Sequence, residues 1–222
     1  MKVGIIGTGA IGLGSVALLL SFNHKPILWS PSGKGTHAFK KNKQLIARGT
    51  VEGTFKPSVV KSAKELALSN DIIKIAVPAY AHKNVIDAIS PFIESRHVIV
   101  ISSHASFSAL YLSKKLAERK VSPLVIAWGT TILSGKKTGT TSVNISTIRE
   151  QVDIATVPQV RIDEGLKVCR DLFGDRFTKR EGLLAIALSN LNPQNHLGIA
   201  LCNLTRIEKG EGWDQALNIT PS

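Results

Sequence analysis

The chain has 222 residues, a length that suits one large domain or one domain and part of a second. Apolar residues make up 43% and charged residues 20% of it, which is a globular composition and excludes disordered, collagen-like and disulfide-rich classes. The formal net charge of +12 directs attention to negatively charged partners. Two cysteines, Cys169 and Cys202, are too few for a disulfide framework, so a reducing, cytoplasmic compartment is expected.

The N-terminal stretch from Val3 to Phe22 is mostly apolar and could be mistaken for a membrane anchor. Five glycines interrupt it, and no small-residue cleavage site precedes His24. We expect a buried strand at 2–6, a glycine turn, and a helix from about Ala10 to Phe22. The sequence therefore predicts neither an export signal nor a membrane segment.

The glycine turn fits the pattern G-x-G-x-x-G between a strand and a helix, which is the context of a dinucleotide-binding loop. Gly7 permits the tight turn, Gly9 lets the backbone approach a pyrophosphate, and Gly12 lets the helix pack closely on the strand. The helix N-terminus offers free N–H groups and a positive dipole end to the phosphates. The predicted cofactor loop consists of Gly7, Thr8, Gly9, Ala10, Ile11 and Gly12.

The next expected strand, 26–30, ends where NAD-binding proteins carry an acidic residue for the ribose 2′-hydroxyl. Here Ser30 stands at that place, and Ser32 and Lys34 follow. Residues 30–64 contain eight basic residues and one acid, a local charge of +7. Hydroxyl and lysine groups hold a 2′-phosphate through charge-assisted hydrogen bonds, each worth about 1.5–3 kcal/mol. The pattern favours NADP(H), bound through these three residues, with NAD(H) as the alternative.

Strands and helices continue to alternate after residue 70. The strand expected at 71–77 ends at Val77, and Pro78-Ala79 follow it. The nicotinamide ribose is usually contacted at the carboxyl edge of a doubly wound sheet. These three residues are therefore assigned to the cofactor site. The further elements expected are helices at 83–93 and 107–119, strands at 97–101 and 124–128, a loop at 129–139, and short strand-like pieces at 140–145 and 152–155.

The apolar strands predict a parallel sheet covered by helices on both faces. After Pro158 the pattern becomes helical. Three helices are expected there, at 161–173, 181–191 and 192–209. We therefore predict an α/β fold in which a Rossmann-type doubly wound parallel sheet, the dinucleotide-binding domain at 1–157, is followed by the start of an all-helical catalytic domain at 158–222.

The last of these helices carries a candidate acid or base. Asn192 suits the N-cap and Pro193 the first helical position. His196 lies in the first turn, on the same face as Asn203 seven residues later. The positive end of the helix dipole disfavours a protonated imidazole and helps to keep His196 neutral near pH 7. A capping or core histidine is the alternative interpretation.

Several motifs spread along the whole chain belong together: residues 4–12 with Trp29-Ser30, residues 101–104, residues 127–131 and residues 183–210. The glycine motif is unspecific, whereas S-N-x-N-P-x-x-H at 189–196, followed by A-L-C-N-L-T-R, is far more specific. Together these motifs resemble the octopine/nopaline (opine) dehydrogenase family.

The resemblance implies a dinucleotide-binding domain followed by an all-helical domain, and the reductive condensation of an α-keto acid with the amino group of an amino acid by NAD(P)H. The two substrates form an imine, which accepts a hydride at its carbon. The histidine of N-P-x-x-H is the acid/base residue in that family, and the role carries over to His196. Asn192 and His104 are candidates for the substrate pocket, with a capping role and a loop role as the respective alternatives.

One departure from the family pattern concerns the helical domain, which continues further in the family and supplies an acidic residue that orients the histidine. Here 65 residues follow residue 157, too few for a closed helical bundle. We expect exposed apolar faces on the helices between residues 181 and 209. The chain is then a truncated form, or a partner such as a second copy completes the core. Asp214 is a distant match for the acidic residue.

Two other functions stay open from the sequence. One is an NADP-dependent reductase of the ketopantoate reductase or hydroxyacid dehydrogenase type, although the sequence does not place the catalytic lysine on which those enzymes usually rely. The other is a non-catalytic NADP-binding fragment. No metal site is predicted. A nucleic-acid partner is not predicted either, because the basic residues are dispersed, aromatic residues make up 5%, and no nucleic-acid motif occurs.

Overall fold

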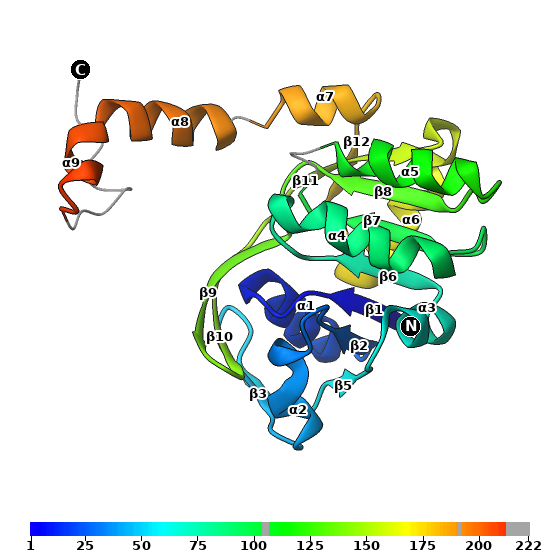
Figure 1. The fold of residues 1–222 in the computed structure, drawn as a ribbon, viewed down its shortest axis with the longest axis horizontal. Coiled ribbons are helices and arrows are strands. Elements are labelled where there is room, and N and C mark those ends of the chain that lie inside the picture. Colours follow the sequence, from blue (N-terminus) through cyan, green and yellow to red (C-terminus); the bar gives the residue numbers. More distant parts are fainter. Residues whose placement is uncertain (104–106, 191, 212–222) are drawn as a thin grey trace. The chain divides into compact units, whose positions relative to one another are not determined.

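The computed structural model describes residues 1–103, 107–190 and 192–211, with residues 192–194 described by their backbone alone (Figure 1). An eight-stranded sheet has the strand order β12-β11-β8-β7-β6-β1-β2-β5, and its neighbouring strands are parallel except for β8 and β11. The predicted α/β class and doubly wound sheet are therefore confirmed. The strands are β1 (Lys2–Ile6), β2 (Lys25–Trp29), β5 (Ser58–Val59), β6 (Ile72–Ile75), β7 (Val98–Ile101), β8 (Leu124–Trp128), β11 (Val152–Val157) and β12 (Phe177–Lys179).

Helices cover both faces of this sheet because successive strand residues point to opposite sides. Ile5 belongs to a core cluster with the helices α1 and α6, whereas Ile6 belongs to a second cluster with α3, α4, α5 and α7. Gly4 lets α3 approach closely, since a Cβ atom there would lie 3.0 Å from the Cγ atom of Leu66. These helices are α1 (Ala10–Ser21), α3 (Ala63–Ser69), α4 (Ala79–Ile89), α5 (Ser108–Glu118), α6 (Ile162–Phe173) and α7 (Leu183–Leu188).

A second, four-stranded sheet has the order β4-β3-β10-β9 and was not predicted. Its β10 pairs with β3 in parallel and with β9 antiparallel. The predicted loop at 129–139 is wrong, because most of it forms β9. The strands of this sheet are β3 (Leu45–Gly49), β4 (Gly53–Phe55), β9 (Leu133–Gly139) and β10 (Ser142–Ile148). The remaining short helices of residues 1–187 are η1 (Lys34–Thr36), α2 (His37–Lys40), η2 (Ser90–Phe92) and η3 (Gln159–Arg161).

The small sheet packs on α1, which therefore lies between two sheets (Figure 1). The contact is close at Gly14, where a Cβ atom would lie 2.8 Å from the Cδ1 atom of Leu133. Residues 12–19 of α1 are all buried. A helix that is apolar on every side is a buried helix, and this packing explains the apolar N-terminal stretch. In the described part of the chain, no helix combines the length and apolarity that crossing a membrane requires.

The C-terminal helices form a separate compact unit, Leu188–Ser222, whereas Met1–Ala187 form the first. The domain boundary predicted after residue 157 lies inside the first unit, since α6 and β12 pack with the sheet. The single helix predicted at 192–209 is wrong: α8 (Asn192–Cys202) ends before Asn203 and α9 (Leu204–Glu208) follows.

Asn203 itself is buried, and its Nδ2 atom donates a hydrogen bond of 2.9 Å to the carbonyl oxygen of Ile199. His196, which the sequence analysis placed on the same helix face, is exposed. Exposed large apolar side chains occur on these helices, as expected from the sequence: Leu184, Leu188, Leu197, Leu201, Leu204 and Ile207.

Candidate cofactor-binding site

The loop between β1 and α1 uses its three glycines in different ways. Gly7 has a φ of +119°, and a Cβ atom there would lie 2.4 Å from the carbonyl oxygen of Ala76. At Gly12 a Cβ atom would lie 2.1 Å from the carbonyl oxygen of Gly7. Apart from the adjoining backbone, no atom of the described residues lies within 4 Å of the Cβ position at Gly9. Packing therefore accounts for the first and third glycines, whereas the second faces open space.

That open space lies in front of the N-terminus of α1. Gly9 is the N-cap residue and has no side chain with which to cap the helix, and the first turn continues with Ala10-Ile11-Gly12. The N–H groups of this turn therefore point outward without a side-chain acceptor from the cap. A helix end of this kind attracts anions because of its free N–H groups and its dipole. The loop has the shape and polarity that a pyrophosphate requires.

A cavity of about 280 Å³ adjoins the loop at the carboxyl edge of the sheet. The strands end together here, because Ile6, Ile75 and Ile101 are in register across β1, β6 and β7. The predicted cofactor residues 9–11 and 77–79, which follow two of these strands, line one common cavity. Its remaining lining residues are Ala76, His82, Ser102, Ser103 and Thr131.

The turn after β6 is shorter than predicted, because the helix that follows it starts earlier. The helix expected from residue 83 begins four residues earlier, at Ala79, with Pro78 as its N-cap residue. Ala79 therefore belongs to the first turn of α4, and Val77 connects this turn to the strand. A second helix N-terminus thus borders the cavity, beside the one of α1.

His82 is a cavity residue that the sequence analysis did not assign to the site. Its Nε2 atom lies 3.0 Å from the carbonyl oxygen of Val77, and its Nδ1 atom contacts the hydroxyl of Ser108 on α5. A carbonyl only accepts, so Nε2 carries the proton and Nδ1 of the neutral ring accepts from Ser108. Burial lowers the pKa of His82, an effect that the bond to Val77 partly opposes. A neutral His82 therefore fixes the backbone of the turn at Val77. The signal in the sequence is its position five residues after Val77, the end of the strand expected there.

The residues assigned to a 2′-phosphate lie beside the glycine loop and outside the cavity. Ser30 is buried directly after β2, and its Oγ atom is 3.4 Å from that of Ser32. The chain then turns at Gly33 and forms η1, where Lys34 is exposed. Gly35 packs on the loop so closely that a Cβ atom there would lie 1.8 Å from the Oγ1 atom of Thr8. The loop after β2 is thus held against the glycine loop.

The catalytic and substrate candidates do not belong to the residues that line the cavity. His196 lies on α8 in the second unit and is exposed, and Asn192 is the first residue of that helix. His104 lies outside the described residues.

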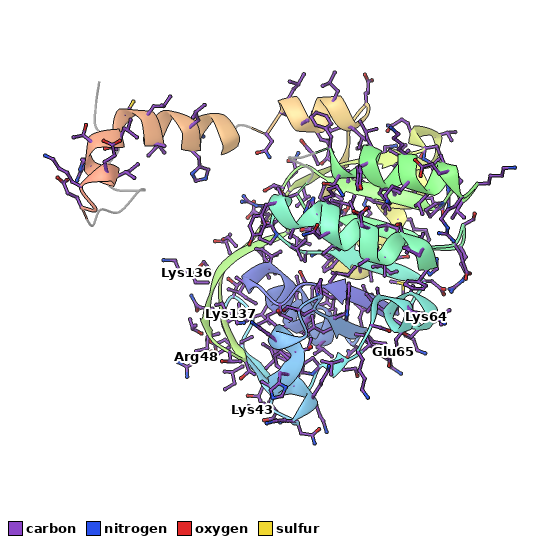
Figure 2. The ribbon with its side chains drawn as sticks, in the orientation of Figure 1. Lys43, Arg48, Lys64, Glu65, Lys136 and Lys137 are labelled. Carbon is purple, nitrogen blue, oxygen red and sulfur yellow. The ribbon has the colours of Figure 1, made fainter. Side chains whose placement is uncertain are left out.

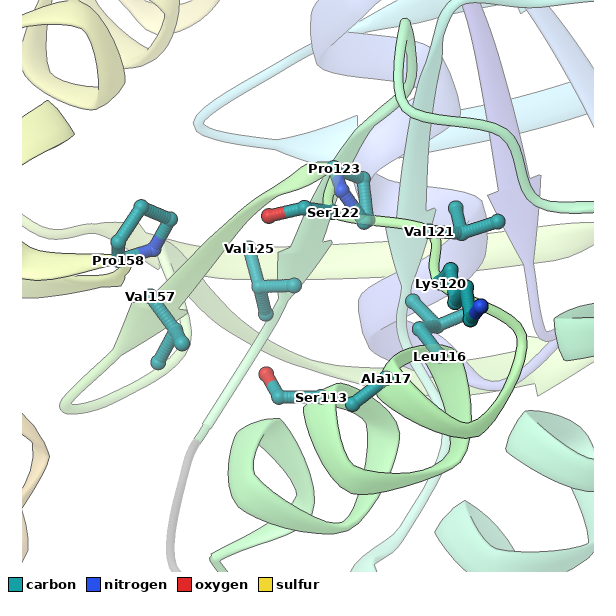
Figure 3. Close-up of a pocket in the computed structure, with 10 residues that line it drawn as sticks. All are labelled: Ser113, Leu116, Ala117, Lys120, Val121, Ser122, Pro123, Val125, Val157 and Pro158. Carbon is teal, nitrogen blue, oxygen red and sulfur yellow. The ribbon is translucent and has the colours of Figure 1, made fainter.

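A second cavity, of about 380 Å³, lies at the opposite edge of the sheet (Figure 3). It is bordered by the C-terminal part of α5, by the start of β8 and by the end of β11, where Val125 and Val157 are paired residues. Its lining is mostly apolar, with Leu116 and Pro158 among its members. Ligands of open α/β sheets bind at the carboxyl ends of the parallel strands, so we do not assign the cofactor to this cavity.

Residues 3–159 match the protein family described as ketopantoate reductase PanE/ApbA. The chain belongs to this family. No curated protein matches the sequence. The family match covers the glycine loop and the strands of the large sheet from β1 to β11, but not β12. It corresponds to the ketopantoate reductase alternative that the sequence left open.

Solved structures share the fold of this PanE/ApbA family member at low sequence identity. Octopine dehydrogenase with NADH and L-arginine is 13% identical with a TM-score of 0.75, covering 100% of this chain and 56% of its own. Yersinopine dehydrogenase with NADP+ is 16% identical with a TM-score of 0.70, and the match covers 96% of this chain and 56% of that enzyme. A PanE/ApbA family ketopantoate reductase from Ralstonia eutropha JMP134 is 14% identical with a TM-score of 0.65, and the match covers 94% of this chain and 65% of that enzyme.

These likenesses show the fold alone, and the chain spans about 56% of the length of the octopine dehydrogenase. The predicted resemblance to opine dehydrogenases thus holds for the fold, whereas the family shown is that of ketopantoate reductase PanE/ApbA.

Proposed function

We propose that this chain binds a nicotinamide dinucleotide and belongs to an NAD(P)H-dependent oxidoreductase. The observation that carries the proposal is the open space at Gly9, in front of the N-terminus of α1 and beside a cavity formed by the ends of β1 and β6. The pyrophosphate lies over Gly9, where backbone N–H groups hold it. The nicotinamide ribose lies in the cavity against Val77 and Ala79.

The remaining residues of the cavity orient the bound group. His82 holds the carbonyl oxygen of Val77 in place, and Pro78 starts the helix that borders the cavity. When bound, the nicotinamide ring supplies or accepts a hydride. NADP(H) is the proposed cofactor because Ser30, Ser32 and Lys34 follow β2 where an acidic residue would serve NAD(H).

The finer proposal is a reductive condensation of opine type, with an amino acid and an α-keto acid as substrates. It is supported by the N-P-x-x-H motif and by the fold shared with octopine and yersinopine dehydrogenases. His196 gives or takes the proton at the substrate nitrogen or oxygen, a role worth about 10²–10⁴-fold in rate. Asn192 and His104 are the proposed substrate-binding residues. The competing function is reduction of a keto group in a 2-keto acid, which the family match favours.

Binding and turnover are tested in two steps with the full chain. Titration with NADPH and NADH, followed by the fluorescence of the reduced nicotinamide, measures cofactor binding. NADPH oxidation is then followed with pyruvate plus assorted amino acids, and with branched 2-keto acids alone. Oxidation that needs the amino acid supports the opine-type reaction, and oxidation by the keto acid alone supports the competing one. Cofactor binding without turnover, and with no effect of His196→Ala on any trace activity, contradicts the catalytic role.

A further inference from the structure

A groove of about 580 Å³ lies between η1 and the hairpin that joins β9 to β10. One wall is formed by Lys34 and Gly35, and the other by residues 137–140. The six lining residues are two lysines, two threonines and two glycines. Lys34 and Lys137 come from segments about a hundred residues apart in sequence, and both are exposed. The small sheet that the sequence did not predict is what brings the second lysine to this place.

The groove continues directly from the glycine loop. Gly35, in its first wall, packs on Thr8 of that loop. Ser30 and Ser32, whose hydroxyls are 3.4 Å apart, stand at the end of β2 just before this wall. In a doubly wound fold the adenosine ribose lies beside the end of the second strand, next to the glycine loop. The groove is therefore where the outer substituents of that ribose point.

The charge of the groove lacks compensation in the described part of the chain. Some lysines there have carboxylate partners, such as Lys83 with Asp87 and Lys179 with Asp163, whereas neither groove lysine takes part in an ion pair. Two cations facing one concave surface repel each other, and an anion between them removes that repulsion.

We propose that Lys137, at the end of β9, is a specificity-determining residue that binds the 2′-phosphate of NADP(H) together with Lys34. The inference rests on the proposed cofactor binding, and it adds a second lysine from a separate sheet to the site predicted after β2. The hairpin thereby selects NADP(H) over NAD(H), because an unphosphorylated ribose gives Lys137 no anion to contact.

The neighbouring residue Lys136 provides a matched control. Successive strand residues point to opposite faces, and Lys136 is paired with Asn144, which is in turn paired with Arg48 on the outer face of the small sheet (Figure 2). Lys136 is not among the residues that line the groove. Lys137→Gln and Lys136→Gln therefore remove the same charge from adjacent positions, and only one of them alters the groove.

The test is equilibrium titration of the unaltered chain and of both variants with NADPH, NADH, 2′,5′-ADP and 5′-AMP. We expect the unaltered chain to prefer the two 2′-phosphorylated ligands. Lys137→Gln should weaken those two by about tenfold and leave NADH and 5′-AMP unchanged, since one charge-assisted contact is lost. Lys136→Gln should change every affinity by less than about twofold, because only long-range electrostatics are affected.

Each other outcome counts against the inference in a distinguishable way. NADPH binding that is unaffected by Lys137→Gln, or weakened equally by both variants, overturns the role of Lys137 and leaves the proposed cofactor binding standing. Equal loss of NADH and NADPH in Lys137→Gln does the same, because it shows an effect on the loop and not on the 2′-phosphate. An unaltered chain that binds neither dinucleotide overturns the proposed function and this inference together.

Discussion

The Nζ atom of Lys74 in β6 donates a hydrogen bond of 2.7 Å to the Oγ atom of Ser15 in α1, and both side chains are buried. The same Nζ atom lies 4.5 Å from the ring centre of Trp128 and 5.0 Å from that of Phe173. A lysine thus crosses the core between the sheet and α1. The aromatic faces favour its charged form, whereas burial favours the neutral form and is the larger effect, lowering its pKa to about 7.

Replacing Lys74 by methionine should change the pH dependence of stability. Between pH 7 and the ordinary lysine pKa of 10.5, the unfolded chain holds this proton and the folded chain does not. The unfolded state therefore binds more protons, and the free energy of unfolding rises with pH through this window, by up to about 1.4 kcal/mol per pH unit. Lys74→Met removes this rise.

Urea unfolding of the unaltered chain and of Lys74→Met, measured between pH 7 and pH 9, checks this expectation. The variant should be the more stable of the two at pH 7, and its advantage should shrink as the pH increases. Lys64→Met, at an exposed position of α3, serves as the control. A stability difference that does not vary with pH contradicts the titration of Lys74 in the folded chain.

Gly9→Ala and Gly12→Ala should separate folding from cofactor binding. At Gly12 the new Cβ atom meets the carbonyl oxygen of Gly7, so we expect a loss of about 1–3 kcal/mol in the free energy of unfolding. At Gly9 the new atom enters open space, and the change should stay within about 1 kcal/mol. Gly9→Ala should therefore keep its stability and still bind NADPH at least about tenfold more weakly. Thermal melts and NADPH titration check both, and undiminished NADPH binding by Gly9→Ala would falsify the placement of the pyrophosphate.

His82→Gln should weaken cofactor binding and flatten the acid dependence of stability. Burial lowers the pKa of His82 below 6.5, so just below pH 6.5 the unfolded chain takes up a proton that the folded chain does not. Stability supplied by the neutral ring is therefore present above pH 6.5 and is lost as the pH falls toward the folded pKa. Unfolding measured between pH 7 and pH 5 should show a smaller loss in the variant. Equal losses in both proteins count against a neutral His82.

The two cysteines should differ sharply in reactivity. Cys169 is buried, accepts a hydrogen bond of 3.3 Å from the indole nitrogen of Trp128, and has its pKa raised to about 12 by burial. Cys202 is exposed at the end of α8. Since the thiolate is the reactive form, iodoacetamide should label only Cys202 in the native chain and both thiols in urea. Peptide mass spectrometry reads the result, and native labelling at Cys169 would show that the core around Trp128 opens readily.

The parts of the fold that sequence reasoning predicted are those with a local signal. The glycine loop, β1 and β8 combine an apolar run with clear punctuation, and their bounds hold to within a residue. β9 was missed because the strand contains two glycines, Gly135 and Gly139, and its exposed half from Lys136 to Gly139 is polar. The small sheet to which it belongs also depends on the pairing of β10 with β3, two strands that lie far apart in the sequence. Nonlocal pairing of this kind leaves no local pattern.

In the candidate site, too, the residues with a local sequence signal were predicted and those that depend on nonlocal contacts were not. Gly9 and Val77 follow from motif and strand end, because the carboxyl ends of parallel strands meet at one edge. His82 was not assigned, because its role depends on a hydrogen bond to Val77 that only the early start of α4 makes possible. Lys137 was not assigned either, since its segment was expected to be a loop. Asn203 was placed on a continuous helix, whereas its side chain bonds back to Ile199 and the helix ends there.

The position of α1 between two sheets has a consequence for the energetics of ligand capture. A helix held on both sides has little freedom to tilt or fray, and its first turn is anchored by the contact between Gly12 and Gly7. The N–H groups that meet an incoming phosphate are therefore already oriented, and little conformational entropy is lost when they engage it. This scaffold is preorganised to bind a phosphate group. Selectivity between ligands therefore depends on the short exposed segments around it, which can vary in sequence without disturbing the helix.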